Sequence, residues 1–247
     1  MTIRKESALL AVMSAGDEWQ SWRALRLAGD DPGPMPPIPY QDEIGAFFGP
    51  GGSPSPGGAG EALCHLKILG LGSSGPAVVA ADWLMEMRTP AEAWLDRPDE
   101  VPGFVDDPGV ARVWATASAA CGLMAVGRDP GPRSVRLLRG EGELEGSFTG
   151  GAYPTFAAAS LYWMVEGPKT EMAEWGLRWI RENTEEWWGE WERATALTFF
   201  GAAGIPAEHA TVDQLLDELL GGLPEDGAED LGLTLRALEL SRHFEAI

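Results

Sequence analysis

The sequence contains few of the residues that build metal sites or disulfide frameworks. Among 247 residues it has two cysteines, Cys64 and Cys121, and three histidines, His65, His209 and His243. The cysteines lie far apart in apolar helical patterns, which is typical of buried reduced thiols rather than of a zinc site or a disulfide. The histidines lack the spacing of metal ligands. The sequence therefore predicts no metal and no cofactor.

Basic side chains and long apolar runs are also scarce. Eighteen lysines and arginines face 38 acidic residues, and the formal net charge is −20. This charge repels nucleic acids and anionic membrane surfaces. No apolar run approaches the roughly 20 residues of a membrane-spanning helix, and residues 8–13 are too short for the core of a signal peptide. We expect a globular, cytoplasmic protein that does not bind nucleic acid, with an oligomeric state that the sequence leaves open.

Strand-like alternation is nearly absent, whereas one helical pattern recurs. A small-residue-rich amphipathic helix of about 12–15 residues ends at or near a glycine six times, with starts about 36 to 50 residues apart. This period is typical of two-helix repeats. The six copies are residues 19–29, 61–70, 113–127, 155–167, 192–204 and 230–240.

A second series of helices with one apolar stripe alternates with the first. Helices rich in alanine and glycine can approach closely, whereas wider charged helices splay apart, and this difference curves a chain of hairpins. The sequence therefore predicts one all-α domain over residues 1–247, an (α/α)6 toroid with a central funnel at the N-terminal ends of the inner helices. The predicted outer helices are residues 6–13, 42–48, 76–87, 133–138, 171–181 and 212–220.

The tract of residues 49–60 is rich in glycine and proline. It has too few apolar side chains to pack against a core. We expect a mobile connection there.

Aromatic residues are the most informative feature of the inner helices. The chain has 11 tryptophans, and aromatic rings supply either large buried area or a π-surface for an apolar or cationic ligand. Ordinary core packing explains any one of them equally well. The predicted substrate-binding residues are Trp114, Tyr153, Phe156, Trp163, Trp188, Trp191 and Phe199.

Two segments carry a family resemblance: Gly150-Gly-Ala-Tyr153-Pro-Thr-Phe156, and Glu225-Asp226-Gly227 followed by Asp230-Leu-Gly-Leu233-Thr234-Leu-Arg-Ala-Leu238. They resemble repeat segments of the prenyltransferase and squalene-cyclase superfamily. The resemblance implies a toroid whose cavity holds an isoprenoid chain. Protein prenyltransferases of this superfamily bind zinc through an aspartate, a cysteine two residues later and a histidine next to a threonine. Gly150, Ala152 and Leu233 stand at these positions, and none of them can bind zinc.

Phe104-Val105-Asp106-Asp107 resembles the Asp-x-Asp-Asp motif of protonation-initiated terpene cyclases, with the first aspartate replaced. The resemblance implies that Asp106 is the proton donor and Asp107 its neighbour. Adjacent carboxylates beside apolar walls can retain a proton, because burial and like charge both raise a pKa. In the alternative interpretation, Asp107 caps a helix that starts at Pro108.

Arg133 and Arg136 are spaced to lie on one helical face. Such a pair could hold a diphosphate through charge-assisted hydrogen bonds. A solvated outer face, with Glu141 and Glu143 as ion-pair partners, explains the same residues.

These observations lead to one main hypothesis and two alternatives. The main hypothesis is a terpene cyclase-like enzyme that binds an isoprenoid or meroterpenoid in an aromatic cavity and cyclises it by protonation from Asp106. The first alternative is a non-catalytic toroid protein that binds an isoprenoid or another small molecule. The second is a subunit of a larger complex.

Overall fold

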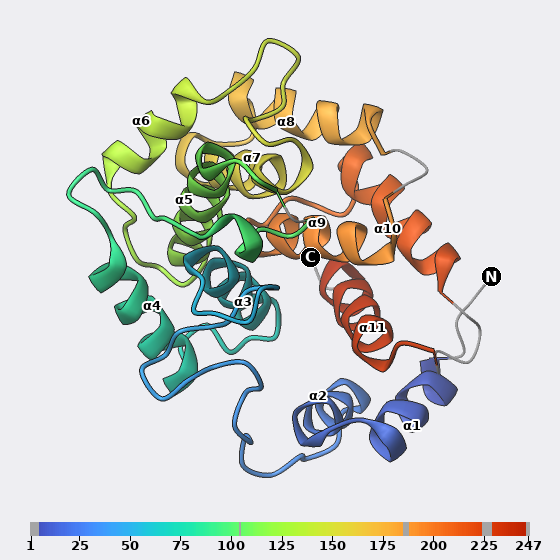
Figure 1. The fold of residues 1–247 in the computed structure, drawn as a ribbon. Helices are drawn as coiled ribbons and strands as arrows, with labels where there is room; N and C mark the ends of the chain where they lie inside the picture. Colours follow the sequence, from blue (N-terminus) through green and yellow to red (C-terminus); the bar gives the residue numbers. More distant parts are fainter. Residues whose placement is uncertain (1–4, 104, 185–187, 224–228, 246–247) are drawn as a thin grey trace.

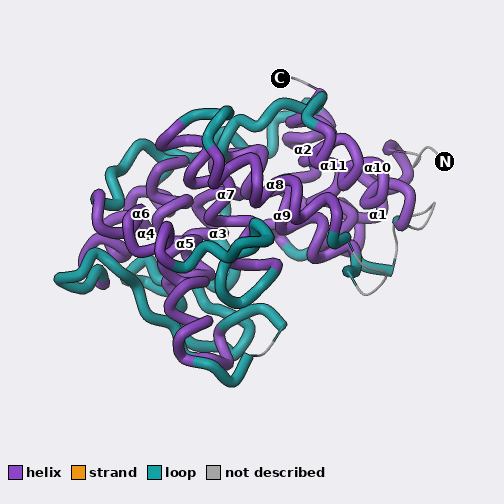
Figure 2. Tube along the Cα trace, turned by 90° about the horizontal axis from the view of Figure 1, so that it is seen from above, coloured by secondary structure: helices purple, strands orange, loops and turns teal. Residues whose placement is uncertain are grey.

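The chain folds into α-helices joined by loops and turns. The computed structural model describes residues 5–103, 105–184, 188–223 and 229–245, and within these ranges it contains no β-strand, only isolated bridges (Figure 2). No helix in the described ranges is long and apolar enough to cross a membrane. The all-α prediction is confirmed. The helices are α1 (Lys5–Ala15), α2 (Glu18–Ala28), α3 (Pro56–Ile68), α4 (Gly75–Met87), α5 (Pro108–Ala125), α6 (Pro132–Gly140), α7 (Ala152–Glu166), α8 (Glu171–Glu182), α9 (Glu190–Ala202), α10 (Ala210–Gly222) and α11 (Leu231–Glu245), with a 3₁₀ turn at Pro98–Glu100.

Inner and outer helices alternate along the chain, as the sequence predicts. Helices α3, α5, α7 and α9 lie in the middle, and α4, α6, α8 and α10 lie around them (Figure 1). Helix α11 packs on α9, and α2 packs on α1 and α11. Helices form at all six segments that the sequence predicts as inner helices and at five of the six that it predicts as outer helices.

The predicted mobile tract contains the start of α3. Ser55 is the N-cap and accepts a hydrogen bond from the Gly58 amide, and Pro56 occupies the first turn. A Cβ at Gly60 would lie 2.2 Å from the Ser118 carbonyl carbon of α5, and a Cβ at Gly122 would lie 2.4 Å from the Gly60 carbonyl oxygen. The glycines therefore let the two backbones touch, so the second half of this tract packs without large apolar side chains.

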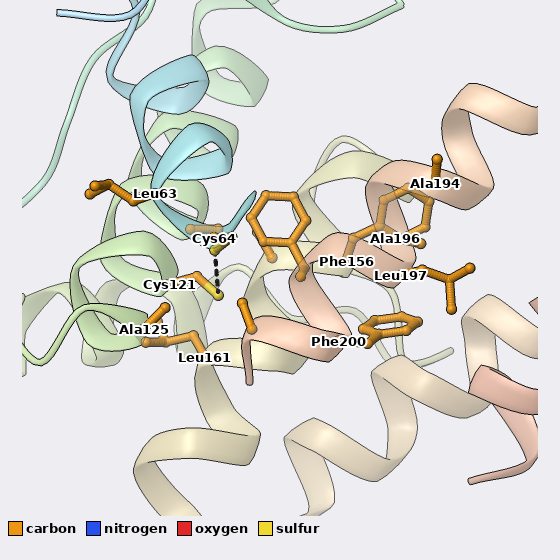
Figure 3. Packing of buried hydrophobic residues seen from close by; sticks show 14 of the residues in the cluster. Leu63, Cys64, Cys121, Ala125, Phe156, Leu161, Ala194, Ala196, Leu197 and Phe200 are labelled. Atoms are coloured by element: carbon orange, nitrogen blue, oxygen red, sulfur yellow. Dashed lines mark hydrogen bonds between the residues drawn. The ribbon is translucent and has the colours of Figure 1, made fainter. Parts of the chain in front are cut away.

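Side chains fill the space between the four middle helices. Cys64 of α3 and Cys121 of α5 are both buried, with sulfur atoms 3.8 Å apart, and Phe156 and Phe200 belong to the same buried cluster (Figure 3). Helix α9 also packs directly on α3. A ring of six hairpins around a central funnel is therefore not confirmed and stays a proposal.

The predicted outer helix at residues 42–48 is a turn instead. The Asp42 carboxylate accepts hydrogen bonds from the amides of Ile44 and Ala46, and Gly45 has a left-handed φ of 94°. A side chain that bonds the local backbone in this way competes with helix formation, and glycine adopts positive φ at little cost. These two effects explain why the helix prediction for this segment was wrong.

The same turn occurs three times, each time before an inner helix. In residues 42–47, 89–94 and 143–148, the first residue donates its amide to the carbonyl of the fifth, and the fourth donates to the carbonyl of the first. The fourth residue has positive φ, and the sixth is a buried aromatic residue. The fourth residues are Gly45, Glu92 and Gly146, and the sixth residues are Phe47, Trp94 and Phe148.

Each turn packs against the outer helix of the next hairpin. A Cβ at Gly45 would lie 2.7 Å from backbone atoms of Val79 in α4, and one at Gly146 would lie 2.7 Å from the Trp175 carbonyl of α8. The Glu92 carbonyl accepts a hydrogen bond from Ser134 of α6. The turns are therefore a repeated element that joins successive hairpins.

Candidate functional site

A cavity of about 400 Å³ opens between the N-terminal halves of α2, α3 and α11. Helices α5 and α9 contribute Trp114 and Trp191 to its wall, and the loops before α3 and α5 complete it. The cavity lies at the N-terminal ends of inner helices, which is the end where the sequence predicts a funnel. It lies beside the filled middle of the fold and not at its centre.

Aromatic side chains form much of the wall. Trp19, Phe47 and Trp114 are buried, whereas Tyr40, Phe48 and Trp191 are exposed to different degrees. The Trp191 indole is 44% exposed, and its Nε1 donates a 2.9 Å hydrogen bond to Asp230 at the start of α11. Exposed aromatic rings in the wall leave apolar surface available to a ligand.

A buried ion pair lies at the inner end of the cavity. Arg23 of α2 donates hydrogen bonds of 2.7 Å and 2.5 Å to the two carboxylate oxygens of Glu239 of α11. His65 Nε2 of α3 lies 3.0 Å from the same carboxylate. Both Arg23 and Glu239 are less than a tenth exposed. Three helices that are far apart in the sequence therefore meet at one carboxylate.

Burial and neighbouring charges determine the protonation states of Glu239 and His65. Burial alone would raise the pKa of Glu239, but the Arg23 charge and the hydrogen bonds from His65 and Arg23 outweigh it and lower the pKa to about 2. Burial, followed by the charges of Arg236 and Arg23, lowers the pKa of His65 to about 3. His65 is therefore neutral at pH 7, and its Nε2–H donates to the ionised Glu239.

A second ion pair lies one turn nearer the opening. Arg236 of α11 donates a 2.9 Å hydrogen bond to Glu61 of α3 and a 3.0 Å hydrogen bond to the Thr198 hydroxyl of α9. The buried Glu100 carboxylate accepts the amides of Gly51 and Ser53. Each of these groups has a fixed partner, so the cavity offers positioned charges beside aromatic surface.

Behind the cavity wall, Asp96 lies against the first turn of α3. Its Oδ2 accepts hydrogen bonds from the Ser55 hydroxyl and the Gly57 amide, and burial raises its pKa to about 7 despite them. Asp96 Oδ1 and Trp114 Nε1 are buried without a hydrogen-bond partner among the described residues. A Cβ at Gly57 would lie 2.2 Å from Trp114 Nε1 and 2.6 Å from Asp96 Oδ2, so both side chains pack on this glycine.

The structure brings five of the seven predicted substrate-binding residues together. Successive edge-to-face ring contacts, with centroids 5.2 to 6.1 Å apart, join Phe199, Trp114, Tyr153, Phe156 and Trp188 into one aromatic cluster. Of these five residues, Trp114 lines the cavity. Trp191 lies in the cavity wall as well, whereas Trp163 contacts His209 elsewhere.

The predicted proton donor, Asp106, does not lie in an apolar environment. Asp106 and Asp107 are exposed, and neither lines the cavity. Asp107 is the N-cap of α5, and its Oδ1 accepts a 2.7 Å hydrogen bond from the Gly109 amide. The structure therefore agrees with the capping interpretation and does not provide the apolar walls that the proton-donor interpretation requires.

The predicted diphosphate pair is also outside the cavity. Arg133 and Arg136 are exposed on the outer helix α6, and the Arg133 guanidinium donates to the Pro90 carbonyl. Glu141, one of their two expected partners, instead pairs with Arg112. Of the segments that carry the family resemblance, residues 225–227 lie outside the described residues.

Sequence reasoning missed the charged residues in and directly behind the cavity wall. Arg236 and Glu239 stand three residues apart on α11, and Arg23 directly follows Trp22 on α2. Charged residues on the otherwise small and apolar face of an inner helix were the available signal. The pairing of these charges depends on contacts between residues more than 200 positions apart in the sequence. Helical periodicity does not predict such contacts.

Within the described ranges, no three histidine, cysteine, aspartate or glutamate side chains are grouped so that they could hold a metal ion. A comparison with protein-family models and with curated proteins finds no match. The similarity to the prenyltransferase and squalene-cyclase superfamily therefore depends on the sequence segments alone.

Proposed function

We propose that this protein binds an apolar small molecule of the isoprenoid type in the cavity between α2, α3 and α11. The observation that carries the proposal is the composition of the cavity wall, in which Trp19, Trp114 and Trp191 stand beside two fixed ion pairs. The cavity volume of about 400 Å³ falls within the range of roughly 300–1,000 Å³ that is usual for small-molecule sites.

The toroid remains part of this proposal. Inner and outer helices alternate, and three equivalent turns precede the inner helices α3, α5 and α7. Repeats of one supersecondary unit build closed or curved arrays because each unit buries its apolar face only against its neighbours. This repetition supports the family resemblance, which also implies an isoprenoid ligand.

The proposal can be tested with a matched pair of tryptophan variants. Trp191 and Trp175 are both partly exposed, but Trp175 lies on the outer helix α8, away from the cavity. Binding of farnesol should be saturable by native mass spectrometry and by titration of tryptophan fluorescence. Trp191→Ala should weaken it by about tenfold, the effect of losing much of one aromatic contact, and Trp175→Ala should not. Absence of saturable binding, or equal losses in both variants, would refute the proposal.

Cyclisation by protonation is a second candidate. Asp106 and Asp107 directly precede α5, the helix that supplies Trp114 to the cavity, and this candidate requires a bound ligand to bury Asp106, which is exposed in the structure. The protein would be incubated with geranyl, farnesyl and geranylgeranyl diphosphates, and the products analysed. Product formation that persists unchanged in Asp106→Asn would reject Asp106 as the acid.

A further inference from the structure

A second hollow lies on the other side of the Arg23–Glu239 ion pair. It has a volume of about 300 Å³ and is formed by the C-terminal parts of α2, α3 and α11. Arg23 lines both spaces, so the ion pair separates this hollow from the cavity described above.

The charge of this hollow is opposite to that of the whole protein. The net charge of the chain is −20, yet three arginines line the hollow, and Glu239 is the one carboxylate among those lining residues that the structure describes. Glu239 is already neutralised by Arg23. Neither Arg26 nor Arg242 has a carboxylate within 4.0 Å in the part of the chain that the structure describes. Two guanidinium charges therefore face one space without an acidic partner.

Both arginines are held in place while keeping free donors. Arg26 Nη1 donates a 3.2 Å hydrogen bond to the Leu69 carbonyl, and the guanidinium carbon lies 5.0 Å from the centre of the Trp22 ring. Arg242 Nη1 donates to the carbonyls of Arg26 and Leu27. These bonds neutralise the negative ends of α2 and α3, and a guanidinium has five N–H donors, so most of them remain for another acceptor.

The other walls are apolar. Leu27, Ile68 and Leu69 are partly buried side chains beside the arginines. Unpaired guanidinium groups next to apolar side chains match an organic anion with one charged group and a short hydrocarbon part.

We propose that this hollow binds the phosphate or carboxylate group of a small organic anion between Arg26 and Arg242, with the apolar part of the ligand against Leu27 and Ile68. The site is separate from the proposed isoprenoid site, and it stands or falls independently of that function. The interaction is a set of charge-assisted hydrogen bonds and needs no chemical step.

Calorimetric titration at constant ionic strength tests the proposal with three probes: butyl phosphate, inorganic phosphate and butanol. Butyl phosphate should bind saturably and more tightly than inorganic phosphate, and butanol should not bind. Butyrate in place of butyl phosphate distinguishes a carboxylate from a phosphate ligand. Arg26→Gln and Arg242→Gln should each weaken binding by about tenfold or more, the usual effect of removing one charged hydrogen-bond donor. The control Arg128→Gln removes an exposed arginine that is paired with Asp82, and it should bind as the native protein does.

Arg242→Gln also removes hydrogen bonds to two backbone carbonyls, so a second readout is needed. The imidazole of His243 lines the hollow, and burial lowers its pKa below the ordinary value. A bound anion raises that pKa by its charge, and proton NMR of the histidine rings follows it in the native protein. A lack of saturable binding, an unchanged His243 titration, or equal affinities in Arg26→Gln and Arg128→Gln would overturn the proposal.

Discussion

Asp96 allows one prediction whose size and pH dependence both follow from the structure. Its pKa of about 7 in the fold stands against 3.8 for an ordinary aspartate. Below pH 3.8 the carboxyl is protonated in both folded and unfolded chains, so it does not make the free energy of unfolding depend on pH. Between pH 3.8 and 7 the unfolded chain loses the proton and the folded chain keeps it, so stability falls as pH rises. Above pH 7 the loss is complete.

Asp96→Asn removes this penalty without changing the shape of the side chain. The amide oxygen can accept the bonds from Ser55 and Gly57 that Oδ2 now accepts. The amide nitrogen then takes the place of Oδ1, which lacks a hydrogen-bond partner among the described residues. In the protonated acid, the hydroxyl group occupies the same position. The variant should therefore resemble the native protein in stability near pH 4. At pH 8 it should be more stable by at most about 4 kcal/mol, the equivalent of the pKa difference, with solvent contact of Asp96 reducing the value.

Urea unfolding at pH 5 and pH 8 measures this effect directly. His65 of the unfolded chain titrates in the same pH range. Its contribution is present in both proteins and therefore cancels in the difference between their free energies of unfolding. Asp106→Asn is the control, since Asp106 is exposed, and its free energy of unfolding should follow the native one at both pH values. If the difference between Asp96→Asn and the native protein were the same at pH 5 and pH 8, Asp96 would be ionised in the fold and the reasoning would fail.

Two other predictions concern packing and acid sensitivity. Gly122→Ala places a Cβ against the Gly60 backbone, and thermal unfolding should show a loss of about 1–3 kcal/mol, whereas Gly140→Ala, where a Cβ meets no described atom within 4 Å, should be neutral or slightly stabilising. The pKa of His65 lies at about 3 in the fold, below its ordinary 6.5, so His65 should reduce stability as the pH falls below 6.5, in the direction opposite to the contribution of Asp96. Between pH 6.5 and 4.5 the His65 component should reach about 2–3 kcal/mol, measured as the difference in acid sensitivity between the native protein and His65→Gln, and equal acid sensitivity of the two proteins would contradict the assignment.

The helices were predictable because local signals agree with the fold. Glycines such as Gly127 and Gly167 have the positive φ expected at the ends of inner helices. The start of α3 was not predictable in this way. Its glycines pack against the backbone of α5, and a composition argument counts only apolar side chains as packing surface. The turn at residues 42–47 was missed for another reason, since its apolar residues fit a helical stripe while Asp42 and Gly45 fix a different backbone.

The site predictions likewise succeeded where the residue type was informative and failed where tertiary contacts decide the outcome. Aromatic residues on inner helices were candidates by type, and Trp114 and Trp191 do lie in the cavity wall. Asp106 was selected through a motif, yet the residues around it leave it exposed. Motif resemblance gives a residue's position in the chain, but the burial that tunes an acid comes from tertiary neighbours.

The position of the buried charges explains how the cavity persists beside a close-packed core. Helices α3 and α5 touch through glycines, and an equally small, apolar seam between α2, α3 and α11 would close in the same way. Arg23, His65 and Glu239 stand there instead, and their hydrogen bonds require the three helices to keep a fixed separation. A buried ion pair contributes little net stability, because desolvation offsets its attraction, but it restricts the helices to one arrangement. The cluster therefore holds open the two spaces on either side of it, and both proposed ligand sites depend on that separation.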